Sequence, residues 1–488
     1  MPARPWTWLI LFAAAVLACA RPQAPGRPPN FVLIVADDQR FDALSVVQRE
    51  QAERARFPWL RTEAVDRLAR EGVRLRNAFV VNSLCSPSRA SILTGRYPHD
   101  VGVLDNHTAF PADTPTFAHA LAERGYRTGY FGKWHMGRQS GPRPGFAHSA
   151  SYLGHGEYFD CEFEVDGVST PTQGWVDDVS VQFAERFLRA DAEQPFLVVL
   201  GLKSGHSPFE PPDSWRGAYA SETPRAVPNL DAPSIYSKSR TTNAQRAARR
   251  RRQGRDGNGA DLDVARDLDQ GYFETLSAAD EAIGKLLALL DELNLTRDTV
   301  VVFTSDNGMY FGEHGLRDKR TAYEESIRTP LIVRYPRRLP AGVVRDELAL
   351  SIDIAPTLLD FAGARPQPEQ HGRSLRPVLE ASASATGPLD GWRDAFFYAY
   401  AAERGSLAPS VTALRTRRHK LVVYPGHPEW TELFDLVEDP YETHNLAELA
   451  ERAELRAALA AERDRLASEL RFPELSSESE PFDESDDE

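Results

Sequence analysis

Three short apolar runs, each ending abruptly in polar residues, constrain the fold of this 488-residue chain more than any other feature. They are FVLIVADD at 31–38, PFLVVLGLKSGH at 195–206 and TVVVFTSDNG at 299–308. Such runs are typical of strands that are buried on both faces of a parallel sheet. Amphipathic stretches such as 276–290, with apolar residues three and four apart, predict helices between them. The alternation predicts an α/β fold, in which helices sandwich a large mixed, mainly parallel sheet.

The pattern changes after about residue 375. The segments at 410–425 and 432–440 read as short antiparallel strands, and a helix is expected from about Leu446 to Leu470. We therefore expect a smaller C-terminal α+β domain with a short antiparallel sheet. The predicted organisation is a signal peptide (1–19), a Pro/Gly-rich linker (20–29), a large domain (30–375), the smaller domain (376–475) and a disordered acidic tail (476–488).

The N-terminal segment MPARPWTWLILFAAAVLACA reads as a signal for export. Arg4 precedes an apolar run that is too short to span a bilayer comfortably. Residues 16–19 resemble a bacterial lipoprotein cleavage box, in which Cys19 would carry the lipid, but Leu17 is unusual there and ordinary secretion stays open. We expect a periplasmic, extracellular or lipid-anchored protein, with membrane contact only through such an anchor.

Charge is unevenly distributed along the chain. The formal net charge is −14, and the last thirteen residues carry seven acids and no base. Overall acidity argues against a nucleic-acid-binding protein. One segment, 246–255, holds six arginines, and it reads either as an exposed mobile loop or as a docking patch for a polyanionic substrate.

Polar residues follow each apolar run, at the edge where α/β sheets bind their ligands. Asp37-Asp38 and Asp306-Asn307 supply three carboxylates and one amide there, while Lys203 and His206 follow the middle run. Three unpaired carboxylates in one pocket would repel one another, and a divalent cation resolves this. An all-oxygen set suits Ca²⁺ or Mg²⁺ better than zinc. The alternative is that each pair caps a following helix or turn.

The stretch LCSPSRASILTG at 84–95 predicts an anion site at a helix start. Pro87 suits the first helical turn and Gly95 suits the exit, so Cys85 would lie at the N-terminus, where the helix dipole favours an anion. Arg89, one turn further on, suits a tetrahedral oxyanion such as sulfate or phosphate. A cysteine at this place is also a candidate thiolate nucleophile. The only other cysteine of the predicted mature chain, Cys161, reads as a packed thiol, and no disulfide framework is expected.

Two long motifs carry a resemblance to a known family. Cys85–Gly95 resembles the sulfatase signature C-x-P-S-R-x-x-x-L-T-G, and Gly125–His135 is similar to that family's second signature, G-Y-x-T-x-x-x-G-K-x-H. The resemblance runs from about Asn30 to Leu446. It also includes the double acid after the first strand and four further segments: 305–308, 312–330, 353–363 and 433–446. It implies the alkaline-phosphatase-like fold, with 30–375 as the catalytic domain of a sulfuric ester hydrolase.

The resemblance also implies a modified nucleophile. A separate formylglycine-generating enzyme would oxidise Cys85 to formylglycine (3-oxoalanine), whose hydrate attacks sulfur and displaces the alcohol. Loss of the second hydroxyl proton then expels sulfate and restores the aldehyde, a route closed to a plain serine. The family ion is usually Ca²⁺, with Mg²⁺ possible. Its implied ligands are Asp37, Asp38, Cys85, Asp306 and Asn307.

The other site roles are carried over in the same way. Arg89 would stabilise the diol and the sulfate charge, while Lys133 and Lys319 would contact sulfate oxygens. His135 would help to remove the hydroxyl proton, and His206 would protonate the leaving oxygen.

Lys203 is a weaker candidate than its neighbour His206, and His371 stands where many family members have aspartate, well away from the chemistry. A further polar contact, which family members draw from the region after the second signature, stays open. The candidates for it are Ser149, Ser151, His155 and Tyr158.

We therefore expect an exported sulfatase that hydrolyses a sulfate monoester, of a sulfated carbohydrate rather than a small aryl sulfate. Its partners would be that substrate and the maturation enzyme, with no nucleic acid. One alternative is a phosphonate or phosphodiester hydrolase on the same scaffold, because phosphate is also a tetrahedral oxyanion. Others are a non-catalytic oxyanion-binding protein with an unmodified Cys85, and a cysteine hydrolase that uses Cys85 and His135. The particular ester, exo or endo action and oligomeric state are not fixed by the sequence.

Overall fold

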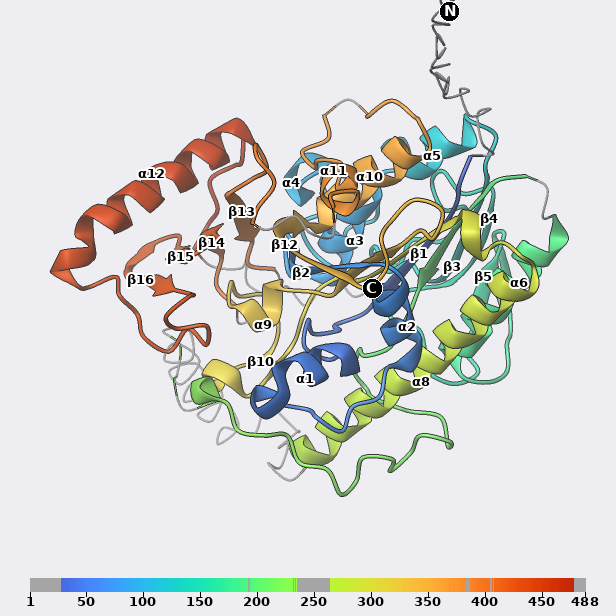
Figure 1. Ribbon diagram of the computed structural model, residues 1–488, viewed down its shortest axis with the longest axis horizontal. Helices are drawn as coiled ribbons and strands as arrows, with labels where there is room; N and C mark the ends of the chain where they lie inside the picture. Colours follow the sequence, from blue (N-terminus) through green and yellow to red (C-terminus); the bar gives the residue numbers. More distant parts are fainter. Residues whose placement is uncertain are drawn as a thin grey trace, which may run out of the picture.

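The computed structural model describes residues 28–191, 194–230, 232, 234, 264–367, 369–382, 387–403, 406 and 408–477. The predicted signal peptide, most of the linker, the arginine-rich segment 246–255 and nearly all of the acidic tail lie outside the described residues. Figure 1 shows the large sheet with its helices beside a smaller sheet that is covered by a single long helix.

The ten strands of the large sheet run in the order β12-β2-β11-β8-β1-β7-β3-β4-β5-β6. Five neighbouring central strands are parallel: β8 (Thr299–Ser305), β1 (Asn30–Ala36), β7 (Phe196–Gly201), β3 (Arg127–Lys133) and β4 (His148–Tyr152). At one edge β11 (Leu331–Arg334) is antiparallel to both β8 and β2 (Val73–Phe79), and β12 (Val343–Leu350) is parallel to β2. At the other edge β5 (Phe163–Val165) and β6 (Val168–Thr170) are antiparallel. The predicted mixed, mainly parallel sheet is confirmed.

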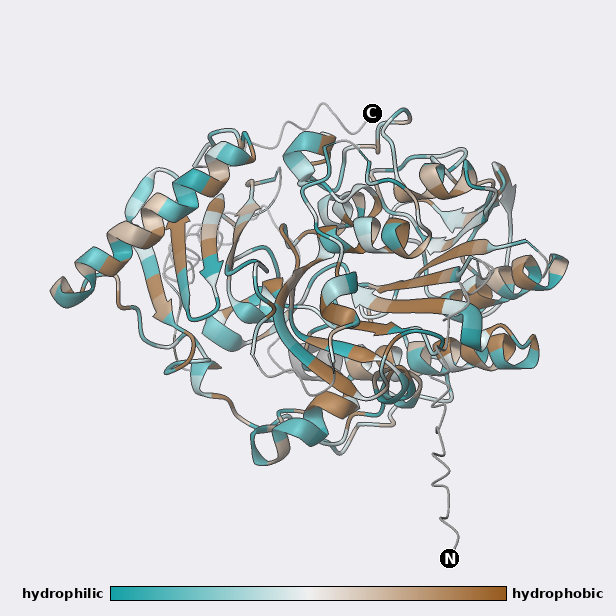
Figure 2. Ribbon diagram, turned by 45° about the horizontal axis from the view of Figure 1, so that its top comes forward, coloured by the Kyte–Doolittle hydropathy of each residue, from teal (hydrophilic) through white to brown (hydrophobic). Residues whose placement is uncertain are grey.

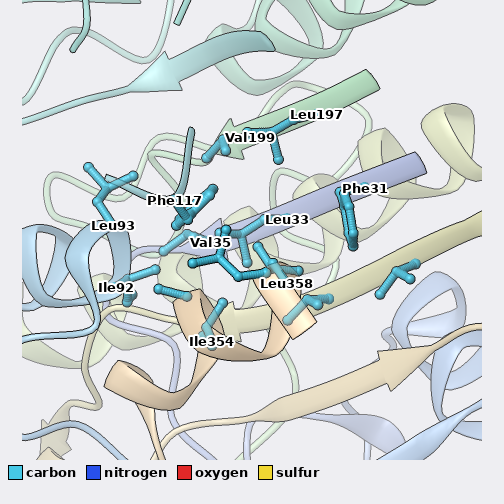
Figure 3. Packing of buried hydrophobic residues seen from close by; sticks show 14 of the residues in the cluster. Phe31, Leu33, Val35, Ile92, Leu93, Phe117, Leu197, Val199, Ile354 and Leu358 are labelled. Carbon is cyan, nitrogen blue, oxygen red and sulfur yellow. The ribbon is translucent and has the colours of Figure 1, made fainter. Parts of the chain in front are cut away.

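The three apolar runs form neighbouring strands at the centre of this sheet, because β1 pairs with β7 on one side and with β8 on the other. Side chains alternate between the two faces of β1. Those of Phe31, Leu33 and Val35 pack against α3 (Cys85–Thr94), α5 (Phe117–Ala122) and α10 (Ile354–Phe361), as Figure 3 shows. Val32 and Ile34 face α2 (Glu63–Glu71), α6 (Val176–Ala190) and α8 (Val264–Glu292). Burial on both faces explains why these strands are continuously apolar, and they are brown in Figure 2.

Short elements connect the main ones. The helices are α1 (Ser45–Gln51), α4 (Pro98–Val101), α9 (Glu324–Ile327) and α11 (Arg376–Leu379). A small antiparallel pair is formed by β9 (Tyr310–Phe311) and β10 (Arg317–Asp318). Every helix within the described ranges is too short or too polar to traverse a lipid bilayer.

The smaller sheet is an antiparallel meander of β13 (Ala395–Tyr400), β14 (Val411–Thr416), β15 (His419–Tyr424) and β16 (His427–Asp435). The helix that covers it, α12, spans Ala453–Glu469 and so begins later than the predicted Leu446. The reason is that Leu446 N–H donates to Leu433 O at 2.8 Å, while Asn445 accepts the N–H of Leu433 at 2.9 Å. These bonds hold the segment against β16 and delay the helix.

The two sheets share apolar contacts. Phe396 of β13 packs on Phe79 of β2 with a ring separation of 5.0 Å. Val378 of α11 follows the predicted domain boundary in the chain, yet its side chain belongs to the core of the large sheet. The antiparallel sheet at the C-terminus is confirmed as a separate region, and the domain boundary at residues 375 and 376 stays a prediction.

Candidate active site

Cys85 is the first residue of α3, whose ten residues are all buried. Leu84 precedes the helix in an extended conformation, and Gly95 follows it with a φ of 72°, donating its N–H to Ser91 O at 2.8 Å. Such a left-handed exit favours glycine. The expected helix start at Cys85 and helix end at Gly95 are both confirmed.

The acids converge at the carboxyl ends of β1 and β8. Ala36 and Ser305 are paired in register, so Asp37 and Asp306 emerge side by side. Asp37, Asp38 and Asp306 are buried and offer carboxylate oxygens within 4.8 Å of one another. Asp38 N–H donates to Asp306 Oδ1 at 3.1 Å, and Asn307 Nδ2 donates to Asp38 Oδ1 at 2.5 Å. These bonds join both pairs into one cluster.

The alternative is that each acidic pair caps a following helix or turn, and in the structure neither pair caps a helix. The helix after β1, α1, begins after Leu44, which occupies its N-cap. Asn307 leads into the strand β9.

Each carboxylate holds one basic side chain. Lys133 Nζ pairs with Asp37, and Lys319 Nζ pairs with Asp38. Arg89 Nε lies 2.7 Å from Asp306 Oδ2. The predicted sulfate-binding lysines therefore lie in the acidic cluster and are buried there. Three positive charges balance three negative ones.

Cys85 lies between these pairs. Its thiol donates to Asp37 Oδ1 at 3.5 Å and accepts from Lys319 Nζ at 3.2 Å. A ring nitrogen of His206 lies within 4.8 Å of Cys85 Sγ and of an Asp37 oxygen. Burial raises the pKa of the thiol well above its ordinary value, which disfavours the thiolate that a cysteine hydrolase needs.

Three histidine rings pack together beside Lys133. The ring of His155 lies between those of His135 and His206, with centroid separations of 3.9 and 4.2 Å. His155 Nδ1 is 3.3 Å from Lys133 Nζ. Burial, and then the charge of Lys133, lowers the pKa of all three rings, that of His155 to about 3. The rings are therefore neutral at pH 7.

These contacts favour His155 among the four candidates for the further polar contact. Ser151 Oγ accepts from Arg143 Nε at 2.7 Å, and Tyr158 OH donates to His206 O at 2.7 Å. Ser149 lies in β4 and bonds to Asp166 through its backbone: its N–H donates to Asp166 Oδ1 at 2.7 Å, and its O accepts from Asp166 N–H at 2.8 Å. The signal that the sequence offered is that His155 lies between two glycines, both of which have positive φ.

Lys203 contacts the histidine group through the backbone of His155. Its Nζ donates to His155 O at 2.9 Å and lies 4.8 Å from the centre of the Tyr158 ring. Its backbone N–H is fixed by Asp177 Oδ1 at 2.8 Å. Burial, and then the charge of Lys133, lowers the pKa of Lys203 to about 8.

The electrostatics of the acids fit a bound cation. Burial raises the pKa of Asp37, but the positive charges of Lys133, Arg89 and Lys319 outweigh it, so that the pKa lies well below its ordinary value. Burial and the charge of Asp37 raise the pKa of Asp306 to about 7. Asn307 Oδ1 is buried and has no hydrogen-bond partner among the described groups. Three carboxylates and an orphaned amide oxygen form a donor set that suits Ca²⁺ or Mg²⁺.

Comparison with known proteins decides the family. The family model described as Sulfatase matches residues 29–364, and the model described as N-sulphoglucosamine sulphohydrolase, C-terminal, matches residues 312–469. The chain belongs to the sulfatase family. The predicted sulfuric ester hydrolase and the alkaline-phosphatase-like fold are thereby confirmed.

Three similar proteins illustrate the range of the family. This sulfatase is 32% identical to an N-acetylglucosamine-6-O-sulfatase of Bacteroides thetaiotaomicron, over 94% of this chain and 90% of that protein. A solved structure described as a complex with its substrate, D-glucosamine-2-N,6-O-disulfate, matches with a TM-score of 0.79 and 30% identity, over 91% of this chain and 98% of that one. The phosphonate monoester hydrolase of Agrobacterium radiobacter matches with a TM-score of 0.71 and 23% identity, over 91% and 96%, which shows a shared fold.

Two residues of the sulfatase lie outside the cluster, as expected. His371 N–H donates to Gly95 O at 2.9 Å, at the end of α3 opposite Cys85. Cys161 is a buried free thiol that donates to Glu162 O and accepts from Glu157 N–H. The structure therefore brings all the predicted site residues into one group, buried except for the half-buried His206, and their catalytic roles stay predictions.

Proposed function

We propose that this sulfatase hydrolyses sulfate monoesters of carbohydrates and acts on 6-O-sulfated glucosamine units. The observation that carries the reaction is the position of Cys85, at the start of α3 and in contact with both Asp37 and Lys319. The two matches at 30% identity or more, a curated relative and a solved structure, are named or described with glucosamine sulfates and extend along nearly the whole length of each; they support the substrate.

Two groups complete the proposed site. Cys85 is oxidised by a formylglycine-generating enzyme to formylglycine, whose hydrate supplies the nucleophilic hydroxyl. A Ca²⁺ ion, or Mg²⁺, held by the oxygens of Asp37, Asp38, Asp306 and Asn307 and by residue 85, supplies positive charge that favours a deprotonated hydroxyl and polarises the ester.

The basic side chains bind and orient the sulfate. Lys319 Nζ contacts Cys85 Sγ directly, whereas Lys133 Nζ pairs with Asp37, which accepts from the same thiol. Both ammonium groups therefore lie where sulfate oxygens would be held. Arg89 is fixed by two bonds, from Nε to Asp306 and from NH1 to Lys133 O at 2.8 Å. Its remaining nitrogen, NH2, is buried without a described partner and is free to donate to the anion.

The neutral histidines are suited to proton transfer. His135 Nδ1 is buried and has no hydrogen-bond partner among the described groups, so it can accept the hydroxyl proton when sulfate is expelled. His206 stands within reach of residue 85 and donates a proton to the leaving oxygen. Because a bound sulfate ester adds negative charge, it favours the protonated form of His206 in the complex.

Export belongs to the same proposal. The N-terminal segment indicates a protein that acts outside the cytoplasm, free or held by a lipid on Cys19. Release of labelled lipid from the purified full chain, or the mass of its N-terminal peptide, distinguishes these two forms.

The test is expression of the full chain together with a formylglycine-generating enzyme, followed by mass spectrometry of the peptide around Cys85. The matured protein is then offered 6-O-sulfated N-acetylglucosamine, glucosamine-2-N,6-O-disulfate, an aryl sulfate and an aryl phosphodiester. We expect an aldehyde at residue 85 and sulfate release mainly from the two sugars. The control, Cys85→Ala, releases none.

Each contrary outcome points to one alternative. An intact thiol in the co-expressed protein excludes the formylglycine mechanism and leaves an oxyanion-binding protein. Equal turnover of phosphodiester and sulfate ester favours a phosphonate or phosphodiester hydrolase on the same scaffold. Inactivation by thiol alkylation, with indifference to chelators, favours a cysteine hydrolase.

A further inference from the structure

Lys319 lies in a turn whose backbone needs outside support. Its neighbours on both sides, Asp318 and Arg320, have φ angles of 72° and 94°, in the left-handed region that non-glycine residues avoid. Lys319 itself is buried and reaches Cys85 Sγ at 3.2 Å. Strained residues of this kind persist only where the surrounding structure holds them in place.

The first support comes from the segment just after β13 of the smaller sheet. Glu403 accepts from Arg320 Nε at 2.8 Å and from Arg320 NH2 at 2.6 Å. Glu403 is buried, and its backbone N–H donates to Tyr400 OH at 3.4 Å. Two nitrogens of one guanidinium on one buried carboxylate fix the direction of the Arg320 side chain.

The second support is a single hydroxyl on β13. Tyr398 OH donates to Arg320 O at 2.6 Å and accepts from Ser83 N–H at 3.3 Å. Ser83 lies two residues before Cys85, so this hydroxyl bridges the segment that leads to the nucleophile and the turn that carries Lys319. The Tyr398 side chain is completely buried.

A neighbouring contact strengthens the bridge. Asn82 Nδ2 donates to Ala399 O at 2.9 Å, and Ala399 N–H donates to Val81 O at 3.2 Å. Strand β13 thus holds the chain before Cys85 by its backbone as well as by Tyr398. The Tyr398 hydroxyl therefore fixes the position of the segment before Cys85 relative to the turn that carries Lys319.

We propose that Tyr398 and Glu403 are positioning residues, which set the distance between the Lys319 ammonium group and the side chain at position 85. The smaller C-terminal sheet is then part of the catalytic apparatus and not only a structural addition. This inference rests on the proposed role of Lys319 in binding sulfate.

The test uses the matured full chain and the variants Tyr398→Phe and Glu403→Gln. The matched control is Tyr97→Phe, because Tyr97 is also buried and its OH donates to Phe397 O, on the same strand, at 2.7 Å. We expect kcat to fall about tenfold or more in both test variants, the size expected for displacement of a catalytic group by a fraction of an ångström to one ångström. The kcat and KM of the control should each change by less than about twofold.

A double-mutant cycle separates positioning from general loss of structure. In a Lys319→Ala background the proposal requires that Tyr398→Phe lowers kcat by less than about twofold further, because the group that it positions is gone. An equal fall in both backgrounds overturns the proposal. So does unchanged activity in Tyr398→Phe and Glu403→Gln.

A measurement without turnover completes the test. Hydrogen exchange followed by mass spectrometry should be faster in the peptide 316–321 of Tyr398→Phe and of Glu403→Gln, and unchanged there in Tyr97→Phe. Unaltered exchange in both variants overturns the inference. If the wild-type protein releases sulfate from no ester, the proposed function fails, while exchange still decides whether the anchors hold the turn. If Tyr398→Phe does not fold, Glu403→Gln carries the same comparisons.

Discussion

The buried carboxyl group of Asp280 predicts how the stability of this fold depends on pH. It lies on α8, is 6% exposed, and accepts the N–H groups of Ala64 and Val65 at the start of α2, at 2.8 and 2.9 Å. Burial, only partly offset by these two bonds, raises the pKa of Asp280 to about 7. The unfolded chain has an aspartate pKa of about 3.9. Between these values the folded state holds a proton that the unfolded state releases.

The direction in which stability changes with pH follows from that difference in pKa. Because the native state binds the extra proton, the contribution of Asp280 to the free energy of unfolding falls as pH rises from about 4 to about 7. A shift of about three pKa units corresponds to about 4 kcal/mol, which is an upper value. Asp280→Asn replaces the carboxyl with a group that keeps one acceptor and does not titrate. We expect the stability of the variant, relative to that of the wild type, to rise by about 2–3 kcal/mol between pH 5 and pH 8.

Urea unfolding followed by circular dichroism, at pH 5, 6, 7 and 8 and one fixed calcium concentration, measures this difference. The matched control is Asp178→Asn, which removes an aspartate that pairs with Lys285 of the same helix at the surface. It should change the stability by less than about 0.5 kcal/mol at every pH. A stability difference between Asp280→Asn and wild type that does not depend on pH would refute the reasoning.

Three further outcomes follow from the contacts described. Chelation of divalent ions should abolish sulfate release by the matured enzyme, and added Ca²⁺ should restore it; full activity in excess chelator would exclude the metal. His155→Ala should lower kcat/KM about tenfold or more, because Lys133 Nζ loses a partner at 3.3 Å, whereas His371→Ala should leave it unchanged in the same steady-state assay. Lys420→Met should cost about 3–5 kcal/mol in urea unfolding, because buried Lys420 lies 2.7 Å from Glu442 and 2.9 Å from Glu324; a loss below 1 kcal/mol would contradict this.

The sequence predicts the parts of the fold that depend on local periodicity. The apolar runs of β1, β7 and β8 identified a parallel sheet because residues buried on both faces leave no alternation. The convergence of Asp37 with Asp306 followed from the rule that parallel strands end at one edge. The predicted start of α12 was wrong because Leu446 is held by a tertiary contact with Leu433, which no local pattern encodes.

The same distinction separates the site residues. Cys85, Arg89 and Lys133 lie in long motifs and could be found from sequence, whereas His155 was one of four equal candidates. Its selection required the packing of rings from three separate segments. Tyr398 and Glu403 carry no motif at all, since their contacts with Arg320 join positions 78 and 83 residues apart.

The pairing of acids and bases in the site restricts the charge of the substrate. Each of Asp37, Asp38 and Asp306 is matched by one lysine or arginine, so the cluster is close to neutral without a metal. A divalent cation on the carboxylates adds two positive charges to a buried pocket, where an unmatched charge is costly. An anionic ester removes part of that excess, while a neutral ester removes none. The site should therefore bind sulfate monoesters, and other anionic tetrahedral esters, far better than carboxylic esters of the same sugar, and inorganic sulfate should compete with substrate.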